Sequence, residues 1–315
     1  IGNSCNILVS DFFRIVEISR ISSGANIFSR DFSTGNFFYS ANNLSVGYGG
    51  THESTASVRI GTRVALGPNN ILNANCLIDL RDKVGTGSDV TFWTHGFHFG
   101  HRVIEGFPPA FMRITVNKNV WLGYNVTLLP GVEVGENSIV AARGVVAKSL
   151  ASNKLCAGVP AREVRDIDFV PRSPLESVEL IRLFVKTWVR ELKYKGIEAE
   201  EVSPKYACKF AVKVKDAELE LDQTVCVLPT ERIDLEELPF DQVIFVSIQE
   251  QPSLRIDLKK GCTLFEIESE NLTGTTNPLV EDLRDFLRRR TLPCGFDNCY
   301  YSISSKTISY LKRLA

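Results

Sequence analysis

The sequence contains little histidine and almost no methionine, with four histidines and one methionine among its 315 residues. It contains eight cysteines but no CxxC pair, which argues against a cysteine-rich metal site. Most of these cysteines stand alone among apolar residues, as reduced core cysteines do in cytoplasmic proteins. We therefore expect free thiols and a cytoplasmic location.

Long apolar runs and an excess of one charge are also absent. No uncharged stretch approaches the ~18 to 20 apolar residues that span a bilayer, so no membrane span is expected. The 36 basic and 37 acidic residues are spread along the chain, which excludes the concentrated basic face that nucleic-acid binding needs. The chain opens at Ile1 without a methionine or a signal-peptide pattern, so further residues could precede it.

A period of six residues organises the first half of the chain. One aliphatic column comprises Val116, Leu122, Leu128, Val134, Val140 and Val146. A second column, four places later, changes from aliphatic to small: Val120, Val126, Val132, Ser138, Gly144 and Leu150. Upstream, the same spacing gives Ile60, Leu66, Leu72, Ile78, Val84 and Val90, with a weaker trace at Ile15, Ile21 and Ile27.

This period fits neither a helix, which repeats every 3.6 residues, nor an ordinary strand, which repeats every 2. Hexapeptide periodicity is typical of a β-helix, in which short strands stack into a prism and the aliphatic columns fill its interior. Such a solenoid has an open edge at each end and needs caps or partners there.

The period breaks between about residues 95 and 113, where the sequence HGFHFGHRVIEGFPPAFMR contains glycines, two prolines and several aromatics. We predict that this segment is a loop outside the prism. The loop carries three of the four histidines: His95, His98 and His101. They could bind a metal, supply a positioned base, or have no function.

The metal interpretation is the weakest of the three. Catalytic zinc needs about three protein ligands and a water. Zinc-dependent β-helix enzymes take their histidines from separate coils, and here the only other histidine is His52, in an earlier loop. We expect no metal.

The segments VWLGYNVTLLPGVEVGENSIVAARGVVAKS and CAGVPAREVRDI closely resemble the C-terminal coils of left-handed β-helix acetyltransferases. Within that superfamily the chain is most similar to the sugar O-acetyltransferases of the galactoside, maltose and capsule type, and xenobiotic acetyltransferases are similar too. The resemblance is strong over residues 114–167, fair from about Val58, and absent after about Arg172. It implies a left-handed parallel β-helix over residues 1–172, with the extended loop at about 95–113.

The resemblance also implies a role for a loop histidine. In this family one histidine acts as a general base on an acceptor hydroxyl, which then attacks the acetyl-CoA thioester. Imidazole suits this step because its unperturbed pKa is about 6.5. The family spacing to Trp121 fits His98 best, with the register off by one residue, and His95 is the second candidate. His101 is expected to be a loop or interface residue.

Further positions match the family's cofactor groove. Trp121 matches a wall of the groove, although an aromatic packed on a corner of the prism is the alternative. The matching lining positions are Gly123, Ala141 and Ala142, and the matching basic positions are Lys148, Arg162 and Arg165. The basic residues would contact CoA phosphates, although solvated surface charge is the common alternative. Arg143 stands where family members usually carry glycine, which could narrow the groove or add a phosphate contact.

The resemblance therefore implies transfer of acetyl from acetyl-CoA to a carbohydrate hydroxyl, by a homotrimer with its sites between subunits. Two alternatives stay open: an acetyltransferase for a sugar amine or antibiotic, and an inactive β-helix scaffold. The acceptor itself cannot be identified from the sequence.

Residues 173–315 lack the six-residue period and show helix and strand patterns instead, which predicts an α+β domain of unknown role. Ser173-Pro-Leu-Glu176 is an N-terminal capping box, and it opens a helix with apolar positions Leu175, Val178, Ile181, Val185, Trp188 and Leu192. Residues 208–214 and 254–258 alternate like half-buried strands. Asn277-Pro278 opens a second helix, with apolar positions Leu279, Leu283, Phe286 and Leu287, that ends in three arginines.

Overall fold

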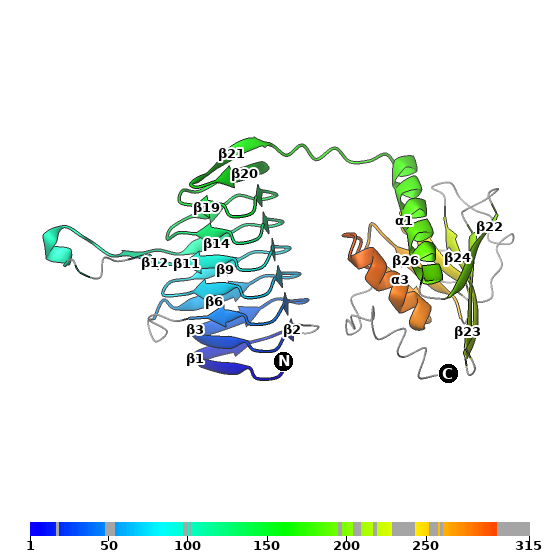
Figure 1. Cartoon of the computed structure of the whole chain (residues 1–315), viewed down its shortest axis with the longest axis horizontal. Coiled ribbons are helices and arrows are strands. Elements are labelled where there is room, and N and C mark those ends of the chain that lie inside the picture. The colour runs from blue at the N-terminus through cyan, green and yellow to red at the C-terminus, as the bar shows by residue number, and fades with distance from the viewer. Residues whose placement is uncertain are drawn as a thin grey trace. The chain divides into compact units, whose positions relative to one another are not determined.

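The structure is a computed structural model that describes residues 1–16, 19–47, 54–96, 100, 102–194, 197–203, 209–216, 219–228, 243–251, 258 and 261–294. The chain forms two compact units, Ile1–Phe169 and Val170–Ala315 (Figure 1).

The first unit is a left-handed parallel β-helix whose short strands stack on three faces. The first face contains β6 (Ser57–Ile60), β9 (Ile78–Leu80), β14 (Ile114–Val116) and β17 (Glu133–Val134). The second contains β2 (Arg20–Ile21), β4 (Tyr39–Ser40), β7 (Ala65–Leu66), β10 (Gly85–Thr86), β15 (Trp121–Leu122), β18 (Ile139–Val140), β20 (Lys154–Gly158) and β21 (Ala161–Asp166). The third contains β5 (Ser45–Val46), β8 (Ile71–Asn73), β11 (Thr91–Trp93), β16 (Thr127–Leu128) and β19 (Val145–Val146).

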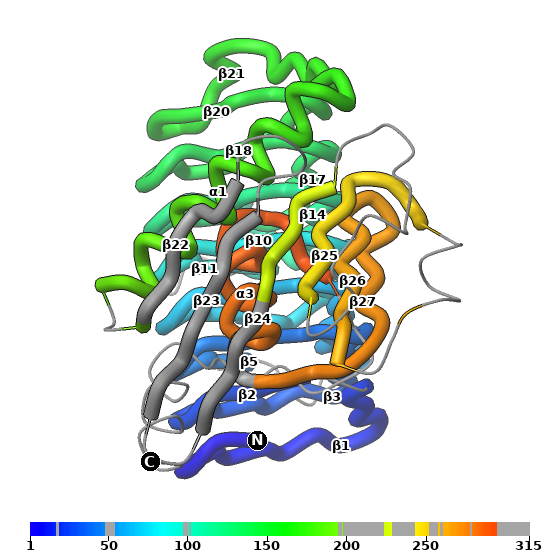
Figure 2. The backbone as a smooth tube through the Cα atoms, turned by 90° about the vertical axis from the view of Figure 1, so that its right-hand side faces the viewer, coloured from blue at the N-terminus to red at the C-terminus, as the bar shows by residue number. Residues whose placement is uncertain are grey.

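The long strand β3 (Asn26–Thr34) turns a corner and belongs to two faces. Its first residues pair with β5 on the third face, and its last residues pair with β6 on the first face. Strand β1 (Asn6–Arg14) pairs along β3 and forms the outermost strand at the N-terminal end (Figure 2).

The two predicted columns from Val116 to Leu150 fill the interior. Leu122, Leu128 and Val140 are fully buried, and each pairs with a partner one coil away. The weak upstream trace is also real, because Ile21 and Ile27 are buried and Ile15 packs against the core.

The predicted column from Ile60 to Val90 is wrong beyond Leu72. Ile78 pairs with Val58, and it is Leu80 that pairs with Ile60, because this part of the coil takes two extra residues. Val84 is buried in the second column instead, where the amide of Gly85 bonds the carbonyl of Val120 on the next coil. Both columns take aliphatic residues in this part of the chain, so the sequence does not show that Val84 has moved from the first column to the second.

The predicted loop leaves the prism after β11 and returns at β14 (Figure 1). Its two arms form a short antiparallel pair, β12 (His95–Gly96) with β13 (Ala110–Phe111), and the 3-10 helix η1 (Val103–Glu105) lies beyond them. The excursion predicted from the broken period is confirmed.

The second unit packs two helices on one face of a six-stranded mixed sheet (Figures 1 and 2). The helices are α1 (Pro174–Tyr194) and α3 (Pro278–Arg288). The strands, in spatial order, are β22 (Glu198–Ser203), β23 (Lys209–Asp216), β24 (Leu219–Val227), β25 (Val243–Ser247), β26 (Thr263–Glu266) and β27 (Asn271–Gly274).

Both predicted helix starts are confirmed. The Ser173 hydroxyl accepts a bond from the amide of Glu176, and the Glu176 carboxylate accepts one from the amide of Ser173. The Asn277 side chain accepts bonds from the amides of Leu279 and Val280.

The prediction that Leu175 belongs to the apolar side of α1 is wrong. Leu175 lies in the first turn and is 67% exposed, whereas the other predicted apolar positions of that helix are buried. The expectation that the cysteines are core residues is wrong for Cys5 and Cys76, which are only half-buried. Cys208 and Cys299 lie outside the described residues, as does all but Leu258 of the predicted strand 254–258.

Candidate functional site

His95 lies at the base of the extended loop, in the first residue of β12. Its ring stacks on Phe111 of the returning arm, with centroids 6.1 Å apart, and meets the edge of Trp93 at 6.0 Å. Burial lowers the pKa of His95 below its ordinary value, because the aromatic surroundings disfavour the charged imidazolium. A lowered pKa favours the neutral imidazole, which is the form that a general base requires.

His98 and His101, the other loop histidines, lie outside the described residues, as does His52. The part of the chain that the structure describes contains no group of three or more histidine, cysteine, aspartate or glutamate residues that could hold a metal ion.

A buried polar cluster lies under the loop base and was not singled out from the sequence. The Thr94 hydroxyl accepts bonds from the amides of Asn75 (2.8 Å) and Cys76 (3.1 Å) and donates to the carbonyl of Asn73 (2.8 Å). The side-chain oxygens of Asn73 and Asn75 are buried and find no hydrogen-bond partner among the described residues. The sequence does contain one sign of this cluster: two asparagines flank Ala74 in a stretch that is otherwise apolar.

Trp121 lies on the outer side of β15 and is 48% exposed. Its indole covers Gly85 on the preceding coil, where a Cβ atom would come within 2.8 Å of the ring. Glycine at 85 is therefore required by the close approach of the ring. The remaining exposed part of the indole is free to form the wall of a groove.

Small residues follow Trp121 at the corner between the second and third faces. The Gly123 amide donates to the carbonyl of Val140, and a Cβ on Gly123 would lie 2.7 Å from the amide nitrogen of Ala142. Gly123 thus lies directly against Ala141 and Ala142 of the next coil.

Arg143 occupies the same corner in the left-handed backbone region, with φ 63°. Its amide donates to the carbonyl of Tyr124 at 2.7 Å. A non-glycine residue there is strained, so the side chain is carried at a cost in stability.

The predicted phosphate-binding cations lie on the last coils. Lys148 is exposed after β19, and Arg162 is exposed on β21, where it pairs with Ala157. Arg165 donates to the carbonyl of Asp166.

The predicted residues do not converge on one corner of the prism. His95 follows β11 at the corner between the third and first faces, whereas Gly123, Ala141 and Ala142 lie at the corner between the second and third faces.

No family model matches the chain. Curated relatives do: galactoside O-acetyltransferase of Escherichia coli (strain K12) is 32% identical over 114 residues, which are 34% of this chain and 56% of that protein. A Staphylococcus aureus (strain MRSA252) protein that carries a provisional acetyltransferase name is 39% identical over 116 residues, which are 34% of this chain and 57% of that protein. The chain thus spans about half the length of the curated relatives it matches.

Solved structures are similar at lower levels. A Vibrio cholerae hexapeptide-repeat acetyltransferase complexed with acetyl coenzyme A is 26% identical, with 43% of this chain and 70% of that chain covered and a TM-score of 0.37. A galactoside acetyltransferase in complex with coenzyme A is 23% identical, with 46% and 64% covered and a TM-score of 0.30. Likenesses this distant do not bear on the activity of this chain.

The stacked hexapeptide coils, the loop that leaves them and the matches to curated relatives agree in one respect: over its β-helix, this chain resembles the hexapeptide-repeat acetyltransferases of the sugar O-acetyltransferase type.

Proposed function

We propose that the chain transfers the acetyl group of acetyl-CoA to a carbohydrate hydroxyl. The observation that carries the proposal is the loop base, where His95 stacks on Phe111 and directly follows Thr94, whose hydroxyl bonds the backbone of Asn73 and Asn75. The likeness to galactoside O-acetyltransferase over the β-helix supports the same chemistry.

A loop histidine acts as the general base in this proposal, with His98 the first candidate and His95 the second. The base takes the proton of the acceptor hydroxyl while that oxygen attacks the thioester carbonyl. The carbon–sulfur bond of the tetrahedral intermediate then breaks, the CoA thiolate leaves, and the histidine returns the proton to it. No acetyl-enzyme forms, because the thioester is already activated.

The cofactor lies along the corner that carries Gly123, Ala141 and Ala142, where small residues permit close approach to the backbone. Trp121 flanks the pantetheine arm. The amides of this corner are suited to bond the developing oxyanion. Lys148, Arg162 and Arg165 would neutralise the phosphates.

We further propose a homotrimer. The loop base and the small-residue corner lie at different corners of one prism, and the packing of one prism against another would bring the two together. The extended loop, with Val103 and Ile104 exposed at its far end, would then contact a second subunit.

The test begins with calorimetric titration of acetyl-CoA into the full chain and into Lys148→Ala, His98→Ala and His95→Ala, with Lys118→Ala, an exposed lysine on another face, as the matched control. We expect binding to weaken in Lys148→Ala alone. Failure of the unmodified chain to bind acetyl-CoA would overturn the enzyme proposal and favour the scaffold alternative, with Arg143 obstructing the corner.

The acetylation rate then identifies the base. Removing it lowers the rate about 10²- to 10⁴-fold while acetyl-CoA binding is retained. If His95 is the base, the acidic limb of the pH–rate profile lies below about 6.5, because its pKa is lowered. An unchanged rate in both histidine variants would contradict the mechanism.

A further inference from the structure

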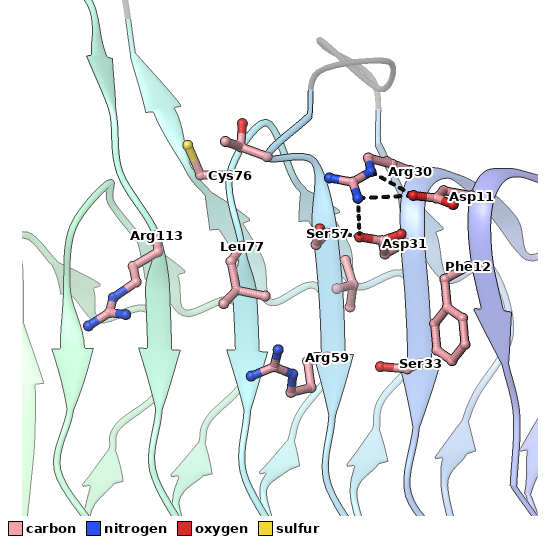
Figure 3. A pocket seen from close by; sticks show the side chains of 12 residues that line it. Asp11, Phe12, Arg30, Asp31, Ser33, Ser57, Arg59, Cys76, Leu77 and Arg113 are labelled. Atoms are coloured by element: carbon pink, nitrogen blue, oxygen red, sulfur yellow. Dashed lines mark hydrogen bonds and ion pairs between the residues drawn. The ribbon is translucent and has the colours of Figure 1, made fainter.

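The first face of the β-helix is hollowed into a groove of about 790 Å³ at its N-terminal end (Figure 3). The groove crosses β1, β3, β6, β9 and the start of β14. Side chains along it stand in register, since Phe12 pairs with Asp31, and Asp31 pairs with Ser57. Five strands at about 4.8 Å spacing give a length of roughly 19 Å, which suits an extended chain rather than a single small ring.

The groove combines an aromatic platform, hydroxyls and charges. Phe12 is 50% exposed at one end, and Arg113 is exposed at the other. Ser33 and Ser57 line the middle, and the Ser57 hydroxyl donates to Asp31 at 3.0 Å. An apolar ring face beside several polar groups is the chemistry that holds a sugar, which has an apolar face and a hydroxylated rim.

The arginines of the groove differ in how closely acidic side chains pair with them. Arg30 is held by Asp11 at 2.9 Å and lies 3.7 Å from Asp31, so this cation is compensated. Arg59 is different: its side chain is 61% exposed, and it reaches only within 3.9 Å of Asp79. That carboxylate lies nearer to Arg81, at 2.9 Å.

Arg113 is exposed and forms no ion pair or hydrogen bond within the described part of the chain. Arg59 pairs through Asp79 with Thr115, so Arg113 lies two strands away and two residues further back along β14, at a Cα separation of roughly 12 Å. This separation exceeds one sugar ring. The two guanidinia are therefore suited to anions on different residues of one chain, and guanidinium binds carboxylate bidentately.

The groove borders the coil that carries the loop base. Thr55 lines the groove and donates to the carbonyl of Asn75 at 2.7 Å, beneath the loop base. Arg113 follows Met112, whose amide donates to the carbonyl of Thr94 at 2.9 Å. One residue of the groove is thus bonded to the polar cluster under the loop base, and another directly follows a residue that is bonded to it.

We propose that this first-face groove binds an anionic oligosaccharide, with carboxylates on Arg59 and Arg113 and a sugar ring stacked on Phe12. Resting on the proposed acetyl transfer, this assigns the acceptor as an acidic polysaccharide segment presented along the prism. The groove holds the acceptor chain in position, and the loop histidine reacts with one of its hydroxyls.

The experiment titrates trigalacturonate and the neutral trisaccharide maltotriose into the full chain and into Arg113→Gln, Arg59→Gln and Phe12→Ala. Lys118→Gln, which removes one exposed positive charge outside the groove, is the matched control. A single-stranded oligonucleotide serves as a polyanion without sugar carboxylates. Acetyl-CoA binding is measured on the same samples.

We expect trigalacturonate to bind at least tenfold more tightly than maltotriose, with about a tenfold loss in either arginine variant, a smaller loss in Phe12→Ala, and no change in Lys118→Gln. Equal binding of the two trisaccharides, or an equal loss in Lys118→Gln, would overturn the inference. So would oligonucleotide binding with the same pattern of losses, because the groove would then be a general polyanion site. Failure of the acetyl-transfer proposal is seen separately, as loss of acetyl-CoA binding with the trisaccharide preference intact.

Discussion

The two units of this chain bury apolar residues in opposite ways. In the β-helix each core residue contacts its counterpart one coil away, as Leu122 contacts Val140, 18 positions along the chain. In the second unit the core joins distant segments: the Trp188 indole on α1 donates to Asp282 on α3, 94 positions away, and Arg290 pairs with Glu191, 99 positions away. The β-helix core is built from contacts between neighbouring coils, whereas the core of the second unit depends on contacts between segments that are far apart in the sequence.

This difference decides how damage should spread. In a stacked solenoid a lost contact weakens two coil interfaces, and the remaining coils keep their own. In a helix-on-sheet unit a lost contact weakens the single core that every element shares. Matched substitutions in the two units therefore test whether a local loss of packing spreads differently in each unit.

Truncating one fully buried leucine in each unit should have the largest effect. Leu128→Ala and Leu283→Ala should each lower the free energy of unfolding by about 2 to 5 kcal/mol, because both leave a cavity. Hydrogen exchange should rise mainly in the coils around β16 for Leu128→Ala, and across α1, α3 and the sheet for Leu283→Ala. Leu183→Ala, at an exposed position of α1, is the control and should change stability by less than about 0.5 kcal/mol. Uniformly faster exchange throughout the β-helix in Leu128→Ala would refute the distinction.

Removing a buried polar contact should cost less. Asp282→Ala leaves the Trp188 N–H buried without this acceptor, which should lower the free energy of unfolding by about 1 to 3 kcal/mol. Ser138→Ala in the β-helix removes bonds to the carbonyl of Ala151 and the amide of Lys154, for about 1 kcal/mol. Chemical denaturation measures both. Asp282→Asn keeps an acceptor and should recover most of the loss; equal losses in the alanine and asparagine variants would show that the indole bond contributes little.

The buried thiols should make the second unit sensitive to alkali. Burial, the largest cause, raises the pKa of Cys294 from its ordinary value of 9.0 to about 12, and burial raises that of Cys156 in the β-helix too. The folded state then holds a proton that the unfolded state releases. Stability is therefore complete below about pH 9 and is lost between 9 and 12, at up to about 1.4 kcal/mol per pH unit.

Cys294→Ala should flatten this part of the stability profile relative to the unmodified chain when unfolding is followed between pH 8.5 and 10.5. An unchanged slope in the variant would mean that other groups dominate.

Glycine substitutions at residues with a left-handed backbone conformation should have the smallest effect on the free energy of unfolding. Arg143 in the β-helix and Thr291 after α3 both adopt φ 63°. Arg143→Gly and Thr291→Gly should each raise the free energy of unfolding by less than about 1 kcal/mol, because the strain relieved slightly exceeds the backbone entropy lost. Thermal unfolding measures the gain, and Lys148→Gly, at a position without positive φ, should show none. A destabilised Arg143→Gly would indicate that the arginine side chain makes a stabilising contact.

The β-helix could be predicted almost coil by coil because its period is local. A residue such as Leu128 is buried by a neighbour at fixed spacing, so the sequence displays the pairing directly. The prediction failed only where two extra residues before Leu80 shifted the register, since Val84 is aliphatic whichever column it joins. In the second unit the capping box at Ser173 and the N-cap at Asn277 were predictable because they too are local.

The candidate site was only partly predictable. The loop and its histidines stand out because they interrupt a period. The groove beside them does not, because Phe12, Arg59 and Arg113 are more than 40 residues apart at each step and share no motif. The pairing of Trp188 with Asp282 is hidden for the same reason.

The sequence by itself determined the prism, the point where the loop leaves it and the starts of both helices, because each depends on residues a few positions apart. Which distant residues share a surface became visible only in the folded chain: Trp121 covers Gly85 across the loop insertion, and outward side chains of successive strands form one groove. The physical reason is that stacking at about 4.8 Å brings every coil's outward residues together, while nothing in their spacing along the chain needs to repeat.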